Sequence, residues 1–172
     1  MTELIATSNN LLFCRLSGND VTMPCAIGRG GMIPAAEKRE GDGASPIGIW
    51  PLRRVFYRAD KIPRPQTALP SIAITKQHGW CDAPDDPNYN QLVTRPYSAS
   101  HEVLWRGDDV YDLIVELGHN DDPPISGLGS AIFLHVAKPD YSPTEGCIAV
   151  ALDDLITILK QVTTDTALQI TR

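Results

Sequence analysis

The chain has 172 residues, of which 42% are hydrophobic, and its 15 Lys and Arg against 21 Asp and Glu give a formal net charge of −6. This length and composition predict one globular domain over residues 1–172 and exclude fibrous and disordered classes. The acidic balance offers no basic surface to a polyanion, which argues against nucleic acid as a partner.

The first part of the chain is typical of a hairpin followed by a loop. Two apolar stretches, Leu11–Phe13 and Val21–Ile27, flank a Gly-Asn-Asp run with turn chemistry. Residues 28–48 are rich in glycine and proline and predict a loop. Ile47–Tyr57 then predicts a strand, in which Pro51 indicates a sheet edge or a bulge.

The remainder of the chain predicts further strands and one helix. Residues 60–100 show little periodicity and indicate a long ordered excursion, which is usually functional when it is ordered. Asp109–Leu117 and Ser130–Val136 are typical of buried strands. Apolar residues recur at helical spacing over 152–159, and residues 167–171 alternate as a final strand would. We therefore predict a mainly-β sandwich or barrel-like sheet with one or two short helices.

The chain shows no feature that would insert it into a membrane or export it. No apolar run approaches the roughly 18 residues of a membrane span. The N-terminal residues lack the basic and apolar regions of a signal peptide. This predicts a cytoplasmic protein or one exported by another route. Four cysteines are too few for a disulfide scaffold.

The stretch SAIFLHVAKPDYSPTEGCIAV, residues 130–150, holds the most informative chemistry. His135 ends an apolar strand, and Cys147 follows twelve residues later, after a proline-containing loop. A thiol needs a nearby base to become a nucleophile at neutral pH, and an imidazole can supply it. Gly146 permits an unusual backbone conformation, and the amides of Gly146 and Cys147 could contribute to an oxyanion hole. By spacing alone, a structural histidine and a buried cysteine stay open as the alternative.

Three segments together carry a resemblance to a known family. The run Ser142–Ile148, with Thr144, Gly146 and Cys147, resembles the Ser/Thr-X-Gly-Cys signature of the L,D-transpeptidase catalytic domain (YkuD-like) family. His135, preceded by Ile-Phe-Leu, resembles the strand that carries the family's general base, and Gly43–Trp50 is similar to its upstream Thr-Pro-X-Gly segment. The order of the three segments also fits the family.

The resemblance implies a YkuD-like fold and a peptidoglycan L,D-transpeptidase. Cys147 would attack a stem peptide and form a thioester, with His135 as the base and Thr144 or a nearby backbone carbonyl orienting the imidazole. Donor and acceptor stem peptides would be the partners, and carbapenems would be possible inhibitors. No cofactor is implied, and we expect a monomer working in the cell envelope or periplasm.

Further residues are candidates for substrate contact. Glu145 stands where the family usually has a histidine, which implies a role in orienting another group or repelling a substrate carboxylate. His119 and Asn120 follow a predicted strand, and Trp80 belongs to an acidic and aromatic segment that would line the entrance. Ser130 is the first residue of the predicted strand that carries His135. The alternatives are a polar turn at His119 and Asn120 and a solvated loop around Trp80.

Other functions stay open at this point. Five residues could be imagined as zinc ligands but lack paired ligand motifs, so we expect no metal: His78, Cys81, His119, His135 and Cys147. The same Cys147 and His135 would also serve an L,D-carboxypeptidase that trims stem peptides. A non-catalytic module that binds wall peptides is the alternative from a different class.

Overall fold

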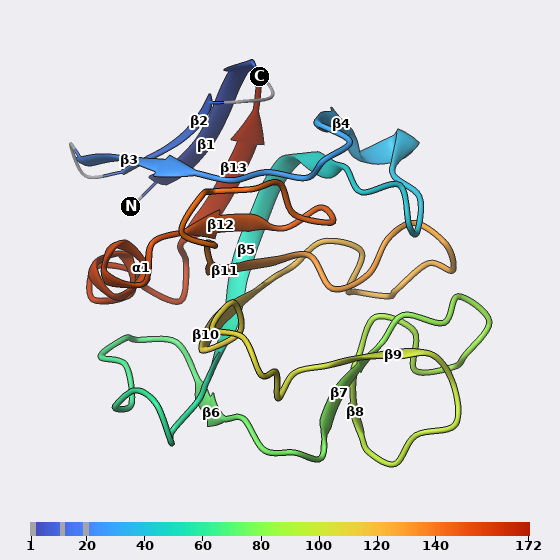
Figure 1. The fold of residues 1–172 in the computed structure, drawn as a ribbon. Helices are drawn as coiled ribbons and strands as arrows, with labels where there is room; N and C mark the ends of the chain where they lie inside the picture. The colour runs from blue at the N-terminus through green and yellow to red at the C-terminus, as the bar shows by residue number, and fades with distance from the viewer. Residues whose placement is uncertain (1–2, 11–12, 19–20) are drawn as a thin grey trace.

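The structure, a computed structural model, describes residues 3–10, 13–18 and 21–172. Within these residues, a large sheet curls on itself and a three-stranded sheet packs beside it, so the predicted mainly-β, barrel-like fold is confirmed (Figure 1). In spatial order, the main path of the large sheet consists of β12 (Ile148–Val150), β11 (Phe133–Val136), β10 (Leu113–Leu117), β5 (Ser45–Tyr57), β13 (Ala167–Thr171), β1 (Glu3–Asn10), β2 (Phe13–Gly18) and β3 (Val21–Cys25).

The two ends of this path meet, which closes the barrel. Ala26, directly after β3, and Ala149 of β12 exchange two backbone hydrogen bonds of 2.7 and 2.9 Å. The first three strands form an antiparallel meander. The predicted hairpin is therefore present as β2 and β3, although Leu11 lies outside the described residues and the second strand ends at Cys25 rather than Ile27.

β5 is the long central strand of the barrel (Figure 1). It pairs with β10 and β13, and the short strands β4 (Met32–Pro34) and β6 (Ser71–Ala73) pair with its two ends. The prediction that Pro51 lies at a sheet edge is therefore wrong. The alternative prediction, a bulge, agrees with an irregularity close to Pro51. The register of β10 shifts between Val115 and Leu117, where β10 passes this part of β5. The break in the ladder accommodates a residue without an N–H donor.

The excursion over residues 60–100 contains more regular structure than its sequence indicates. Besides β6, it holds β7 (His78–Cys81) and β8 (Leu92–Thr94), which form the small sheet with β9 (His101–Val103). Strands of three or four residues are too short to produce a visible period, so the sequence pattern could not reveal them. The two predicted buried strands start later than expected, at Leu113 and Phe133.

Hydrophobic side chains pack on both faces of β10 and β11. On the outer face, Ile114 and Phe133 belong to one cluster with Trp80 of the small sheet, and the rings of Trp80 and Phe133 pack edge to face with centroids 5.1 Å apart. We call this set the outer cluster: Phe56, Ile74, Trp80, Leu104, Tyr111, Ile114, Phe133 and Cys147. The barrel interior receives the alternate side chains of the same strands: Leu113, Val115, Leu134 and Val136.

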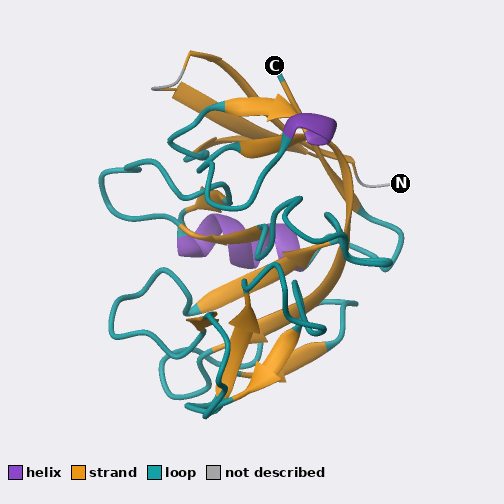
Figure 2. Ribbon diagram, turned by 90° about the vertical axis from the view of Figure 1, so that its right-hand side faces the viewer, coloured by secondary structure: helices purple, strands orange, loops and turns teal. Residues whose placement is uncertain are grey.

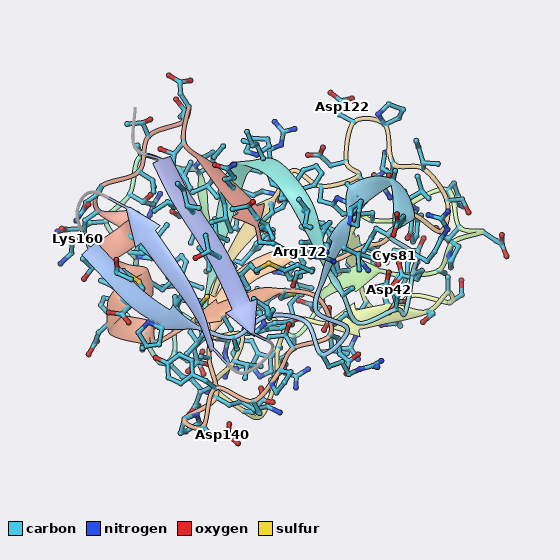
Figure 3. All side chains as sticks on the ribbon, turned by 90° about the horizontal axis from the view of Figure 1, so that it is seen from above. Asp42, Cys81, Asp122, Asp140, Lys160 and Arg172 are labelled. Atoms are coloured by element: carbon cyan, nitrogen blue, oxygen red, sulfur yellow. The ribbon has the colours of Figure 1, made fainter. Side chains whose placement is uncertain are left out.

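Among the described residues, helical structure is limited to α1 (Leu152–Leu159) and the 3-10 turn η1 (Ala35–Glu37) (Figure 2). The expected helix over 152–159 and the final strand over 167–171 are both confirmed. Leu155 and Leu159 of α1 belong to the interior cluster. In Figure 3, Lys160 at the end of α1 lies on the opposite side of the molecule from Asp42. No helix in the described part of the chain is long and apolar enough to cross a membrane.

Leu134 provides a test of this packing, because its side chain is fully buried in the barrel interior. Leu134→Ala is expected to lower the free energy of unfolding by about 2–5 kcal/mol, since it leaves a cavity between strands. Denaturant unfolding measures the change. Ile49→Ala is the control, because the Ile49 side chain is 64% exposed; it should change stability by less than about 0.5 kcal/mol. Equal effects of the two variants would contradict the packing described here.

Candidate active site

A cleft of about 400 Å³ lies where the outer face of the barrel meets the small sheet and its connecting loops. Cys147 and His135 both line this cleft. Its wall also carries Tyr111 and the carboxylates of Glu102 and Asp82. The structure therefore brings the predicted nucleophile and base to one cavity.

The strand register explains why these two side chains lie on the same face of the sheet. β11 and β12 run parallel, with Leu134 beside Ile148 and His135 beside Ala149. Side chains alternate between the faces of a sheet, and neighbours across a ladder share a face. Since Leu134 and Ile148 point into the barrel, His135 and Cys147 lie on the outer face.

The thiol of Cys147 is held by backbone groups. Its Sγ donates to the carbonyl of Ala131 at 3.2 Å and accepts from the N–H of Phe133 at 3.4 Å. The residue is only 7% exposed. Burial raises the pKa of the Cys147 thiol to about 12, and the charge of Glu102 acts in the same direction. The resting thiol is therefore protonated at neutral pH.

The imidazole of His135 is oriented by its own strand. Nδ1 lies 2.9 Å from the carbonyl oxygen of Val136, which can only accept, so Nδ1 carries the proton and Nε2 is the basic nitrogen. The ring of Tyr111 packs edge to face against the imidazole, with centroids 5.4 Å apart. Burial lowers the pKa of His135 to about 4. The imidazole is neutral at neutral pH and can accept a proton.

Together these states make a neutral thiol and neutral imidazole, not an ion pair. Such a pair transfers its proton as the sulfur attacks, in the manner of general base catalysis. In this structure the thiol bonds to the Ala131 carbonyl rather than to His135. Catalytic hydrogen bonds often become short only when substrate binds, so this geometry is compatible with the pair acting together.

The turn before Cys147 is fixed by hydroxyl groups. Thr144 Oγ1 donates to the Cys147 carbonyl at 2.7 Å and accepts from the Gly146 N–H at 3.1 Å. Ser45 Oγ donates to the Gly146 carbonyl at 2.8 Å and accepts from the Gly28 N–H at 2.9 Å. Gly146 has φ of +131°, and a Cβ there would lie 2.8 Å from the Ala44 carbonyl oxygen, so the position needs glycine.

Three predicted substrate residues do not line the cleft. Trp80 is 2% exposed in the outer cluster, and its Nε1 donates to Asn90. His119 is buried, its Nε2 faces the Leu128 carbonyl, and its ring packs against Trp50. Asn120 bonds through its side-chain amide to the backbone of its own loop. The contacts of Asn120 match the alternative of a polar turn, and Trp80 stabilises the small sheet.

The other two predicted substrate residues do line the cleft. Ser130 is 8% exposed, and its Oγ makes no hydrogen bond within the described residues. Glu145 lies at the rim, where its carboxylate accepts a hydrogen bond of 2.8 Å from Arg29 Nε. Both partners of that pair are largely exposed, so it contributes little to stability.

Comparison with known proteins identifies the family. The model of the YkuD family, described as the L,D-transpeptidase catalytic domain, matches residues 4–170. This chain belongs to the YkuD family. No curated protein sequence matches it. A solved structure, L,D-transpeptidase 1 of Mycobacterium tuberculosis, is similar with a TM-score of 0.43 and 15% identity over 99% of this chain and 59% of that chain.

Within this YkuD domain, the structure adds residues that sequence patterns did not single out. Ser45 lies in the Gly43–Trp50 segment already recognised, but its contact with Gly146 depends on a long-range approach. Tyr111 and Glu102 come from segments with no motif, and a hydrogen bond of 2.7 Å joins them. Among the residues that the structure describes, no group of three His, Cys, Asp or Glu is arranged to hold a metal ion.

Ser45 provides a test of the nucleophile turn, because it is fully buried and bonds to two backbone groups. Ser45→Ala leaves a buried N–H and a buried carbonyl without this partner, and is expected to lower the free energy of unfolding by about 1–3 kcal/mol. Ser98→Ala, at an exposed position, is the matched control and should be neutral. Denaturant unfolding distinguishes them, and a neutral Ser45→Ala would show that the hydroxyl does not hold the turn.

Proposed function

We propose that the protein is a peptidoglycan L,D-transpeptidase that joins two stem peptides through a thioester on Cys147. The observation that carries this proposal is the shared placement of Cys147 and His135 in one cleft of a YkuD domain. A protonated thiol and a neutral imidazole that line one cleft, with Nε2 as the basic nitrogen, are suited to acyl transfer. Residues 1–172 would act as one catalytic domain and as a monomer in the cell envelope.

Acylation begins when the donor stem peptide enters the cleft. His135 Nε2 takes the thiol proton while the sulfur attacks the carbonyl that follows the L-centre, and the imidazolium then protonates the departing D-residue. The backbone carbonyl of Val136, rather than Thr144, would orient the imidazole, because His135 Nδ1 contacts this carbonyl. Thr144 acts instead on the turn that holds Cys147.

The oxyanion of the tetrahedral intermediate needs a hydrogen-bond donor near the sulfur. The N–H of Gly146 is engaged by Thr144 Oγ1, so the Cys147 N–H is the better candidate of the two amides. Gly146 contributes by allowing the chain to turn sharply before the nucleophile. Ser130, with its unpartnered hydroxyl in the cleft, is a candidate contact for the donor peptide.

The group that resolves the thioester decides whether the enzyme is a transpeptidase or a carboxypeptidase. An amine of a second stem peptide would resolve the thioester into a cross-link, whereas water would give the L,D-carboxypeptidase reaction with the same residues. Glu145 at the rim is held by Arg29, and this negative charge would repel a substrate carboxylate at the entrance.

Cys147→Ala tests the proposal, because it removes only the sulfur. The purified variant should release no D-residue from a disaccharide tetrapeptide and form no cross-linked dimer, as measured by mass spectrometry of the products. A carbapenem should add its mass to the unaltered protein and not to the variant. Cys81→Ala is the control, since Cys81 is buried outside the cleft lining; it should keep both activities.

The same products separate the alternatives. Released D-residue without any dimer would identify a carboxypeptidase. Activity that survives in Cys147→Ala would contradict the thioester mechanism. An unaltered protein that binds the peptide without forming an acyl-enzyme would identify a binding module and overturn the proposed function.

A further inference from the structure

One wall of the cleft is acidic and comes from the small sheet and a neighbouring loop. Glu102 lies in β9, Asp82 follows β7, and Glu40 approaches from the loop after η1; all three line the cleft. Trp80 and Glu102 are paired in the register of β7 and β9, and Asp82 follows Trp80 by two residues, so this sheet places Asp82 and Glu102 on neighbouring strands and the same face. No ion pair among the described residues involves these three carboxylates.

Buried polar atoms without partners lie in the same cleft. Asp82 Oδ1 and Ser130 Oγ are each shielded from solvent and make no hydrogen bond within the described residues. Ser130 as a whole is 8% exposed. A buried polar atom without a partner is destabilising, so it indicates a position that a bound molecule would fill.

Glu102 is held in position but has no ion-pair partner among the described residues. The hydroxyl of Tyr111 donates to Glu102 Oε1 at 2.7 Å. Burial raises the pKa of Glu102, and the charges of Asp82 and Glu40 add to the effect. Cations also line the cleft: Lys38, Arg106 and Lys138. Lys38 donates to Asp42, and the guanidinium of Arg106 donates to Asp108. Since burial disfavours the charged form of Glu102, a cation bound beside it would stabilise the carboxylate.

The position of Glu102 relative to the Cys147 sulfur indicates which cation would bind there. Glu102 is close enough to Cys147 to raise the pKa of the thiol, and Tyr111 contacts both Glu102 and the ring of His135. A cation held at Glu102 would therefore lie beside the reacting atoms. In an acyl transfer to an amine, the group that must arrive there is the attacking amine.

We propose that Glu102, assisted by Asp82, binds the ammonium group of the acyl acceptor and so favours cross-linking over hydrolysis. This inference rests on the proposed function. The acceptor class is an alkylammonium carried by a peptide, which is protonated at pH 7 because its ordinary pKa is about 10. Water, the competing nucleophile, has no charge for these carboxylates to hold.

The proton and bond changes of this step balance. The bound ammonium first releases one proton to solvent, and the resulting amine attacks the thioester carbonyl to form the C–N bond. Its second proton passes to His135 Nε2 as the tetrahedral intermediate forms. The C–S bond then breaks, and the Cys147 sulfur takes that proton, leaving an amide, a neutral thiol and a neutral imidazole.

Glu102→Gln tests the inference, because the amide oxygen can still accept from Tyr111 while the charge is lost. Acyl-enzyme formed from the tetrapeptide donor is offered either an amine-bearing stem peptide or hydroxylamine, which is uncharged at pH 7. The variant should lower kcat/KM for the peptide amine about tenfold, as expected for the loss of one charge-assisted hydrogen bond. Its reaction with hydroxylamine, measured on the same acyl-enzyme, should stay within about twofold.

Asp82→Asn is a second variant and should lower kcat/KM for the peptide amine in the same selective way. Glu37→Gln is the matched control, because Glu37 is exposed on η1 and does not line the cleft. Equal losses with the charged and uncharged nucleophiles, or no loss with either, would overturn the role of Glu102 while the proposed function stands. Absence of any acyl-enzyme in the unaltered protein would overturn the proposed function and this inference with it.

Discussion

The candidate site depends on the parallel pairing of β11 with β12. This register sets Leu134 beside Ile148 in the barrel interior and leaves His135 and Cys147 on the outer face. A slip of one residue would reverse every side chain of a strand, and would move the thiol into the barrel core. The interior side chains that resist such a slip therefore also position the nucleophile.

The small sheet turns that outer face into an enclosed site. Trp80 and Phe133 pack together above the barrel, and Tyr111 links the same layer to His135. This layer shields both residues from solvent, and the resulting burial raises the pKa of Cys147 and lowers that of His135. The packing that positions the pair therefore also keeps both groups uncharged until a substrate enters.

Local patterns predicted a large part of this structure. The helix over 152–159, the strand over 167–171 and the Cys147 turn follow from apolar spacing and from the glycine at 146. The short strands of the small sheet could not be predicted in this way, because three or four residues are too few to show an alternation of apolar and polar side chains. Their pairing is set by long-range contacts with the barrel, which a sequence pattern does not contain.

Long-range contacts also limit how much of the candidate site could be predicted from the sequence. Cys147 and His135 could be predicted because a motif and a strand mark them. Ser45 contacts the Cys147 turn, and Glu102 lines the cleft, only through tertiary contacts. Trp80 and His119, which the sequence predicts as substrate contacts, are not among the residues that line the cleft. An aromatic ring or imidazole in a polar segment resembles a binding residue, but here tertiary packing buries both side chains away from the cleft lining.

The protonation state of His135 tests the account most directly. Nitrogen-15 NMR of the resting protein, with the signal assigned by its loss in His135→Gln, reports charge and tautomer, and only four histidines contribute. Because the pKa of His135 is lowered to about 4, the ring should stay neutral, with its proton on Nδ1, from pH 8 down to about pH 5 and become charged only below that. An imidazolium at pH 7, or a proton on Nε2, would contradict the neutral pair.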